Sequence, residues 1–236
     1  APAAAPRCRR ACAAAGRGTA DTMAGEPGAF SLREVLTSFQ TCVTERREVL
    51  LGPYLQGWRG LVRFLQALGT VFSLICKDAV AKVQIMEGYL SGEHGARYES
   101  LQLMVQHELA EGLVGFQPRS GRPDSGCRTL LRLHRALRWL ELFLEGLRTA
   151  SHNSRTSAIC TESYNASLAA YHPWFVQKVA TAAFCTLPSR DTFLESMNAG
   201  TAEEAVAMLG EALPCIRNVY SITQELFAQH GMLDLP

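Results

Sequence analysis

From Ser31 onwards, hydrophobic residues recur roughly every three to four positions through almost the whole chain, and this spacing constrains the fold most strongly. It gives an α-helix one apolar face, whereas a strand needs apolar and polar residues in alternation. No segment alternates for long enough to predict a strand. The pattern therefore predicts an all-α domain. The helices are expected at 31–50, 57–88, 97–115, 126–150, 156–171, 174–186, 190–198 and 202–230.

Glycine, proline and capping residues mark the expected helix boundaries. Gly52-Pro53 is expected to end the first helix, and PRSGRPDSG at 118–126 separates the third from the fourth. Thr201, with Glu204 three residues later, is typical of a capping box at a helix N-terminus.

The length and composition of the chain fit one sizeable globular domain. Its 236 residues are 47% hydrophobic and 19% charged, and we place the domain at 23–236. Residues 1–22 are rich in Ala, Arg and Gly and lack the apolar core of a secretory signal. We expect them to be a disordered or non-native extension ahead of Met23. A mitochondrial presequence shares this composition and stays as the alternative.

Charge and cysteine spacing argue against several kinds of function. Four arginines and one aspartate give residues 1–22 a charge of +3, so the remaining residues carry −2 of the total of +1. A nucleic-acid-binding domain would be clearly basic, so no nucleic-acid partner is expected. The eight cysteines show no CxxC spacing, which argues against zinc and favours reduced thiols in a cytosolic protein. No apolar run reaches the ~20 residues that a membrane-spanning helix needs.

The segment 126–147 carries three arginines on one helix face. Arg128, Arg132 and Arg135 recur at i, i+4 and i+7, on the same side as Trp139. The opposite face, which we expect to be exposed to solvent, holds His134, Arg138, Glu141 and Glu145. The three arginines are therefore predicted to point toward the interior. Because an unpaired buried charge costs several kcal/mol, they need an internal carboxylate or an anionic ligand.

The expected second helix also carries charges on its inward face. Asp78 and Lys82 are an i, i+4 pair on the same side as Ile85. Taken alone, they would be a surface ion pair worth a few tenths of a kcal/mol. If this helix faces the arginine helix across a pocket, Lys82, Arg128 and Arg132 supply three cations against one carboxylate. That surplus suits a phosphate monoester, which arginine can bind through two parallel hydrogen bonds.

Other residues give weaker signals. His172 and Trp174 flank a proline at a helix junction, and taken alone each is more often a core residue. His107-Glu108 does not complete the zinc motif HExxH, because Glu111 stands at the position of the second histidine. The motifs of serine hydrolases, P-loop enzymes and dinucleotide-binding enzymes are absent from the sequence, so neither a cofactor nor a metal is expected.

Three segments resemble a known family. They are GWRGLVRFLQALGTVFSLICKDAVAK at 57–82, GCRTLLRLHRALRWLELFLEGLRT at 126–149 and SYNASLAAYHPW at 163–174. They are similar to the glycolipid transfer protein family, and the similarity extends from about Phe30 to the final LDLP. The resemblance implies a two-layer sandwich of about eight helices that encloses lipid chains in a hydrophobic pocket. It also implies a head-group site at the surface of that pocket.

The resemblance also implies a role for each matching residue. Asp78 would bind the sphingoid amide NH and His172 the amide carbonyl, while Lys82, Arg128 and Arg132 would hold a phosphate. In the sugar-selective branch of the family, asparagine stands where this chain has Lys82 and tryptophan where it has Arg132. The implied ligand is therefore ceramide 1-phosphate. Arg135 is expected either to support the other arginines or to pair with a carboxylate elsewhere.

The expected function is non-vesicular transfer of ceramide 1-phosphate between membranes, without chemistry. We expect a cytosolic monomer, transiently peripheral on organelle membranes, with the Golgi and plasma membrane suggested by the resemblance. Trp174, Arg119 and Arg122 are the expected contacts with anionic phospholipid surfaces. Two alternatives stay open. One is a lipid phosphatase that uses His172, and the other is a helical adaptor whose arginine face binds an acidic partner.

Overall fold

The computed structural model describes residues 30–67, 69, 72–115 and 124–236, and within these ranges the protein is all-α, as predicted. Nine α-helices lie there: α1 (Leu32–Gln40), α2 (Leu51–Ala67), α3 (Ser73–Ser91), α4 (Leu101–Ala110), α5 (Gly126–Thr149), α6 (Thr156–Asn165), α7 (Trp174–Phe184), α8 (Arg190–Glu195) and α9 (Ala202–Gln229). Two 3₁₀ turns, Gly95–Arg97 and Ala169–Tyr171, connect them. The β-structure of the described ranges amounts to two isolated bridges, Val43 with Val49 and Leu50 with Ser100.

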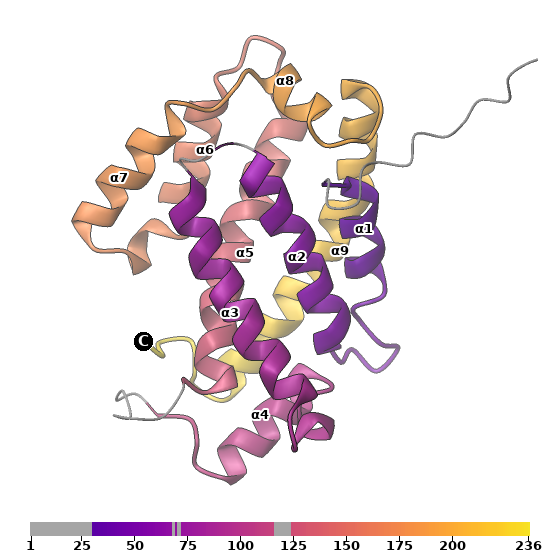
Figure 1. Ribbon diagram of the computed structural model, residues 1–236, viewed down its shortest axis with the longest axis vertical. Coiled ribbons are helices and arrows are strands. Elements are labelled where there is room, and N and C mark those ends of the chain that lie inside the picture. Colours follow the sequence, from indigo (N-terminus) through magenta and orange to yellow (C-terminus); the bar gives the residue numbers. More distant parts are fainter. Residues whose placement is uncertain (1–29, 68, 70–71, 116–123) are drawn as a thin grey trace, which may run out of the picture.

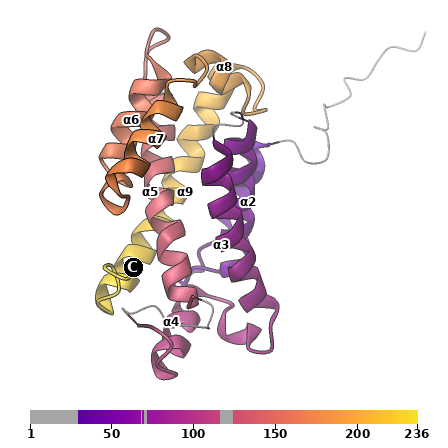
Figure 2. The same ribbon diagram turned by 60° about the vertical axis from the view of Figure 1, so that its left-hand side comes forward.

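The helices form two layers with a core between them. Figure 2 shows α2 and α3 in one layer and α5, α6 and α7 in the other. α1 packs against α2 and α9, and α9 packs along α5, so this side of the sandwich is closed. α4 and α8 lie at opposite ends (Figure 1). Large buried side chains from both layers fill the interior: Trp58, Phe64, Trp139, Phe143, Phe184 and Phe193.

The first two predicted helices were wrong in extent. The helix predicted at 31–50 ends at Gln40, and the one predicted at 57–88 is two helices, α2 and α3. Gly69 separates them with φ = +107°, a conformation that other residues rarely adopt. Pro53 lies inside the first turn of α2 and does not end the preceding helix. Proline is tolerated there because the N–H groups in the first turn of a helix have no acceptor within the helix, so the missing N–H of proline costs no hydrogen bond.

The later helix boundaries agree more closely with the prediction. The helix expected at 126–150 spans Gly126–Thr149, and Ser125 caps it by accepting a hydrogen bond from the N–H of Arg128. The capping box is confirmed, since the Thr201 hydroxyl and the Glu204 carboxylate each bond to the other residue's N–H. The break rich in proline and glycine before α5 and the capping pattern before α9 therefore identified these two boundaries correctly.

The face of α5 that was predicted to be exposed is buried in part, so the prediction was wrong for His134 and Glu141, whereas the side chains of Arg138 and Glu145 are 38% and 31% exposed. His134 is only 2% exposed, and Glu141 is also buried. Glu141 Oε1 accepts hydrogen bonds from Nε and Nη2 of Arg217 on α9, at 3.0 and 2.7 Å. His134 Nε2 lies 2.7 Å from Oε1 of Gln224, also on α9. α5 is thus a central helix, and its buried polar residues His134 and Glu141 have partners on α9.

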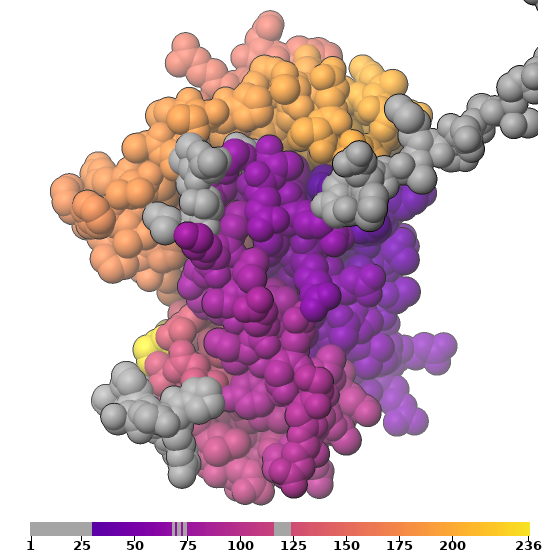
Figure 3. Space-filling model, in the orientation of Figure 1, coloured from indigo at the N-terminus to yellow at the C-terminus, as the bar shows by residue number. Residues whose placement is uncertain are grey.

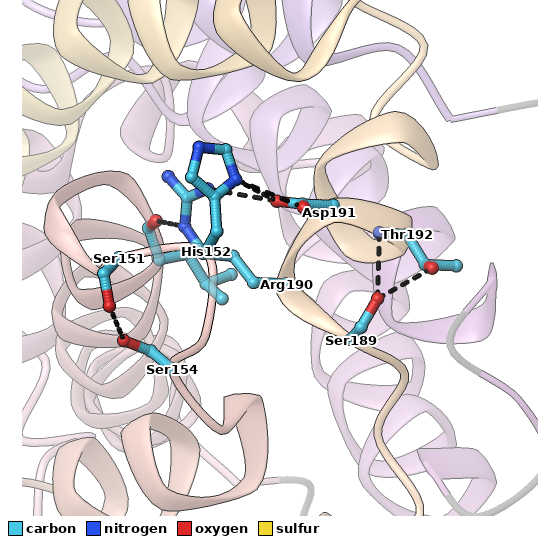
Figure 4. A network of polar contacts seen from close by, with 8 residues as sticks. Ser151, His152, Ser154, Ser189, Arg190, Asp191 and Thr192 are labelled. Carbon is cyan, nitrogen blue, oxygen red and sulfur yellow. Dashed lines mark hydrogen bonds and ion pairs between the residues drawn. The ribbon is translucent and has the colours of Figure 1, made fainter.

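A polar network joins the end of α5 to α8 (Figure 4). Arg190 is buried, and its Nε donates to the carbonyl oxygen of Leu147 at 2.8 Å. Asp191 lies 3.3 Å from Arg190 Nη1 and 3.2 Å from Nδ1 of His152. Ser189 caps α8 by accepting from the N–H of Thr192. The contacts fix the α5–α6 connection to α8, at the end of the molecule opposite α4.

Some expectations lie outside the described residues, namely those on residues 1–22, on Cys8 and Cys12, and on Arg119 and Arg122. The six cysteines in the described ranges form no disulfide, in line with the predicted free thiols. Within those ranges, none of the helices combines the length and the apolar character needed to cross a bilayer.

Candidate functional site

A cavity of about 450 Å³ opens beside α3, α5 and α7. Figure 3 shows the surface hollowed on the left, where α3 in magenta, α7 in orange and the C-terminal residues in yellow approach one another. The inner wall is largely apolar and includes Trp58, Leu65, Trp139, Leu140, Leu168 and Ala180. Five predicted site residues also line the cavity: Asp78, Lys82, Arg132, Arg135 and His172. The cavity therefore combines an apolar interior with a cluster of ionisable groups.

Asp78 and Lys82 form an ion pair at the edge of the cavity, between Oδ1 and Nζ. The Lys82 side chain is 11% exposed, whereas that of Asp78 is 71% exposed. The predicted inward orientation therefore holds for Lys82, which buries its aliphatic stem, and fails for Asp78. It also fails for Ile85, which is exposed. The buried face of α3 is formed by Cys76, Ala79, Val83 and Met86.

Arg128 and Arg132 share a carboxylate that the sequence did not single out, Asp124. Nη1 of Arg132 lies 2.8 Å from Asp124 Oδ2, and Nη1 of Arg128 lies 3.8 Å from Oδ1. Arg132 lines the cavity, whereas Arg128 is 7% exposed and meets the cluster through Asp124. The three cations, counting Lys82, thus face two carboxylates rather than the one expected. Asp124 lies in a segment that looked like a simple helix break, and its i, i+4 spacing to Arg128 was the available signal.

The start of α5 is held by Glu108 of α4. This buried carboxylate accepts hydrogen bonds from the N–H groups of Gly126 and Cys127, at 2.6 and 2.9 Å. The Tyr98 hydroxyl donates to the same carboxylate at 3.1 Å. Glu108 and Ser125 therefore occupy the N–H groups that a helix start would otherwise offer to an anion. An anion beside Arg128 must accordingly be bound by side chains.

Arg135 contacts the C-terminal segment, residues 233–236. Its Nη2 donates to the carbonyl oxygens of Leu233 and Leu235, at 2.7 and 3.0 Å. The guanidinium carbon lies 4.1 Å from the centroid of the Tyr171 ring. Nη2 of Arg132 donates to the carbonyl oxygen of Pro236 at 3.4 Å, and Pro236 lines the cavity. The C-terminal segment therefore forms part of the cavity wall, a role that its sequence did not suggest.

His172 also lines the cavity. Its Nδ1 lies 2.6 Å from the hydroxyl of Tyr164, which is buried against Trp139. Burial lowers the pKa of the half-buried His172 imidazole, and the nearby Asp78 carboxylate acts in the opposite direction. The net effect favours the neutral imidazole at neutral pH, which has one donor and one acceptor nitrogen.

An exposed apolar surface on α7 lies next to the cavity. Trp174 is 70% exposed and Phe175 is exposed to the same degree, with Val176 and Val179 also on the surface. Val176 lines the cavity as well. Only Trp174 was expected to be exposed, although the run Trp174-Phe175-Val176 was visible at the start of the helix. We call these four residues the α7 patch.

The comparisons with known proteins agree with this arrangement. Residues 49–199 match a family model described as Glycolipid transfer protein (GLTP). The human ceramide-1-phosphate transfer protein is 60% identical over 207 residues, which cover 88% of this chain and 97% of that protein. The Xenopus tropicalis protein of the same name is 58% identical, with the same coverage of both chains.

Solved structures show the same similarity. The crystal structure of the human ceramide-1-phosphate transfer protein with bound 2:0 ceramide-1-phosphate has a TM-score of 0.84 and 60% identity, covering 88% of this chain and all of that one. The apo form of the mouse protein has a TM-score of 0.85 and 57% identity, with the same coverage. The similarity therefore includes both sequence and fold.

Proposed function

The chain belongs to the glycolipid transfer protein family, and on this premise we propose that it carries ceramide 1-phosphate between membranes without altering it chemically. The observation that carries the proposal is the cluster of Lys82 and Arg132 at an apolar cavity. A neutral sugar head group would not need these cations. Relatives at 60% identity that bear the name of a ceramide 1-phosphate carrier support the same ligand.

The phosphate would be bound by Lys82, Arg128 and Arg132. Arg132 lines the cavity, and Lys82 reaches it from the opposite helix, so a phosphate between α3 and α5 can contact both. Guanidinium groups match phosphate oxygens with two parallel N–H donors, while the ammonium group adds a compact charge. Arg128 lies within ion-pair distance of the same Asp124 carboxylate as Arg132, so its charge adds to the attraction.

The amide of the lipid would be bound by Asp78 and His172. The exposed Asp78 carboxylate can accept a hydrogen bond from the amide N–H. If the Tyr164 hydroxyl donates to Nδ1 of His172, the neutral imidazole carries its proton on Nε2 and can donate to the amide carbonyl. The two ends of the amide would therefore meet an acceptor and a donor of the correct kind.

The apolar interior of the cavity supplies the free energy for extraction. Each CH₂ exposed to water costs about 0.8 kcal/mol, so a sixteen-carbon chain alone resists extraction by on the order of 10 kcal/mol. Burial against side chains such as Trp58, Leu65 and Leu140 removes most of this cost. A carrier with this cavity therefore lowers the barrier without changing the lipid.

Docking on a membrane would use the α7 patch. Trp174 and Phe175 are large exposed aromatic side chains beside the cavity, and such side chains partition into the membrane interface. Arg119 and Arg122 stay predicted contacts with anionic lipid. We further propose a cytosolic monomer that is transiently peripheral on the Golgi and plasma membranes. The domain at 23–236 and the non-native or disordered nature of residues 1–22 also stay predictions.

Neither alternative function gains support. The matching family and the relatives compared above are lipid transfer proteins rather than enzymes, which argues against the phosphatase. An adaptor would need its arginine face on the surface, but Arg128 is buried and Arg132 lines a cavity.

A vesicle-to-vesicle assay with labelled ceramide 1-phosphate tests the proposal. Arg132→Leu removes two charge-assisted donors and should slow transfer by roughly 10- to 100-fold, the range that hydrogen bonds to charged groups produce. Arg148→Leu is the matched control, because Arg148 lies on the same helix and pairs with Glu145 away from the cavity. Equal transfer by Arg132→Leu and the parent protein would show that the head-group assignment is wrong.

A further inference from the structure

We infer that Asp124, whose partly exposed carboxylate lies beside Arg132 and Arg128, competes with the phosphate for the arginine donors and sets how readily the lipid is released. The inference rests on the proposed function, since it assumes a phosphate bound by Arg132 and Arg128. The three cations create the affinity for the phosphate, and Asp124 would limit that affinity.

The position of Asp124 is fixed from two directions. Its carboxylate lies 2.8 Å from Nη1 of Arg132 and 3.8 Å from Nη1 of Arg128, through different oxygens. Its backbone carbonyl accepts a hydrogen bond from the Tyr89 hydroxyl of α3 at 2.9 Å. The residue also directly precedes Ser125, which caps α5. Both layers of the sandwich therefore hold Asp124 beside the arginines.

The contacts of Arg132 place an anionic acceptor on its guanidinium group. Nη1 is directed at Asp124, and Nη2 donates to the carbonyl oxygen of Pro236 at 3.4 Å. Arg132 has five N–H donors, so a phosphate can bind it beside Asp124 through the donors that these two contacts leave. The phosphate then lies close to the Asp124 carboxylate, and the two anionic groups repel each other. The carboxylate thus weakens phosphate binding while Arg132 provides it.

A carrier benefits from this opposition because it must release the lipid as well as capture it. Lys82, Arg128 and Arg132 carry three positive charges, and Asp78 and Asp124 carry two negative charges, so these five side chains have a net charge of +1. Removing the charge of Asp124 raises this to +2. Stronger binding of a phosphate dianion follows, and its dissociation becomes slower.

Asp124→Asn isolates this effect, because asparagine keeps the shape and an oxygen that accepts from Arg132. Equilibrium binding and dissociation are measured with a fluorescent short-chain ceramide 1-phosphate and with the matching ceramide, which lacks the phosphate. The variant should bind the phosphorylated lipid about tenfold more tightly, equivalent to ~1.4 kcal/mol, and release it more slowly. Its affinity for ceramide should not change.

Glu145→Gln is the matched control, because it removes the carboxylate partner of Arg148 on the same helix. This control should bind both lipids as the parent does, and thermal melting of both variants checks the fold. Asp124→Ser, which also removes the charge, should change the affinity in the same direction as Asp124→Asn.

Two results overturn the inference while the proposed function stands. One is equal or weaker binding of the phosphorylated lipid by both Asp124 variants, which would mean that the carboxylate orients the arginines or has no effect. The other is an equal gain in affinity for ceramide, which would mean that the substitution acts on the cavity rather than on the phosphate site. If the parent protein does not prefer ceramide 1-phosphate to ceramide, the proposed function fails, and the inference fails with it.

Discussion

Lowering the pH from 7 to 5 should destabilise the fold through His134, the imidazole that α5 buries against α9. Its ring stacks on Tyr220 with a centroid distance of 4.2 Å, and its Nε2 lies 2.7 Å from Gln224 Oε1. Burial lowers the pKa of His134 from 6.5 to about 4, because the imidazolium would lose its hydration. The hydrogen bond to Gln224 acts in the opposite direction, and repulsion by Arg135 adds to the lowering.

The sign and size of the effect follow from these two pKa values. Between pH 6.5 and about 4, the unfolded chain binds more protons than the native protein. The free energy of unfolding therefore falls as the pH falls through this window. Each pH unit is worth at most about 1.4 kcal/mol, so His134 should account for a loss of about 2 kcal/mol between pH 7 and 5. The pKa of His172 is lowered as well, so its protonation acts in the same direction.

Urea unfolding at pH 7 and pH 5 measures this loss in the parent protein and in His134→Gln. Glutamine can still donate a hydrogen bond to Gln224 but does not titrate, whereas His172 titrates in both proteins. The variant should therefore lose about 2 kcal/mol less than the parent on acidification. Equal losses in the two proteins would refute the assignment of the effect to a buried, neutral His134.

Three further results are expected. Replacing Trp174 and Phe175 together by alanine should reduce co-sedimentation of the protein with anionic vesicles and leave binding of a short-chain lipid intact. Undiminished co-sedimentation would exclude the α7 patch as the docking surface. Glu108→Ala should lower the free energy of unfolding by about 3 kcal/mol, because buried N–H groups lose a charged acceptor; a loss below about 0.5 kcal/mol, as at ordinary surface sites, would contradict this role. Arg135→Met should speed amide hydrogen exchange in residues 227–236, and unchanged exchange would mean that Arg135 does not hold the C-terminal segment.

The fold could be predicted where local chemistry decides it. The boundaries of α5 and the capping box at Thr201 depend on neighbouring residues, so the sequence identified them. The burial of His134 and Glu141 could not be predicted in this way, because their partners lie 90 and 76 residues away on α9. A 3.6-residue period does not distinguish a polar face that meets solvent from one that meets matching polar groups. Gly69 was missed because a single glycine interrupts an otherwise continuous apolar pattern.

The candidate site could be predicted in part. Helical spacing placed Lys82 and the arginines on inward faces and left open whether the two helices face each other; Lys82 and Arg132 do line one cavity. His172 lines it too, although its position followed only from the resemblance. Asp124 and the C-terminal segment were missed, because their contacts depend on where α5 begins and on how the chain returns after α9. The contacts of Arg132 with Asp124 and Pro236 have no local sequence pattern, whereas the i, i+4 spacing of Asp124 to Arg128 was a local signal that the sequence analysis did not use.

Competition between two lipids tests the central claim most directly. Vesicle-to-vesicle transfer by the parent protein is measured with labelled ceramide 1-phosphate and, separately, with a labelled neutral glucosylceramide. Each measurement is repeated in the presence of an excess of the other lipid without a label. Ceramide 1-phosphate should be transferred, and excess glucosylceramide should not slow it. Transfer of both lipids at similar rates, or mutual competition, would contradict a site built for phosphate.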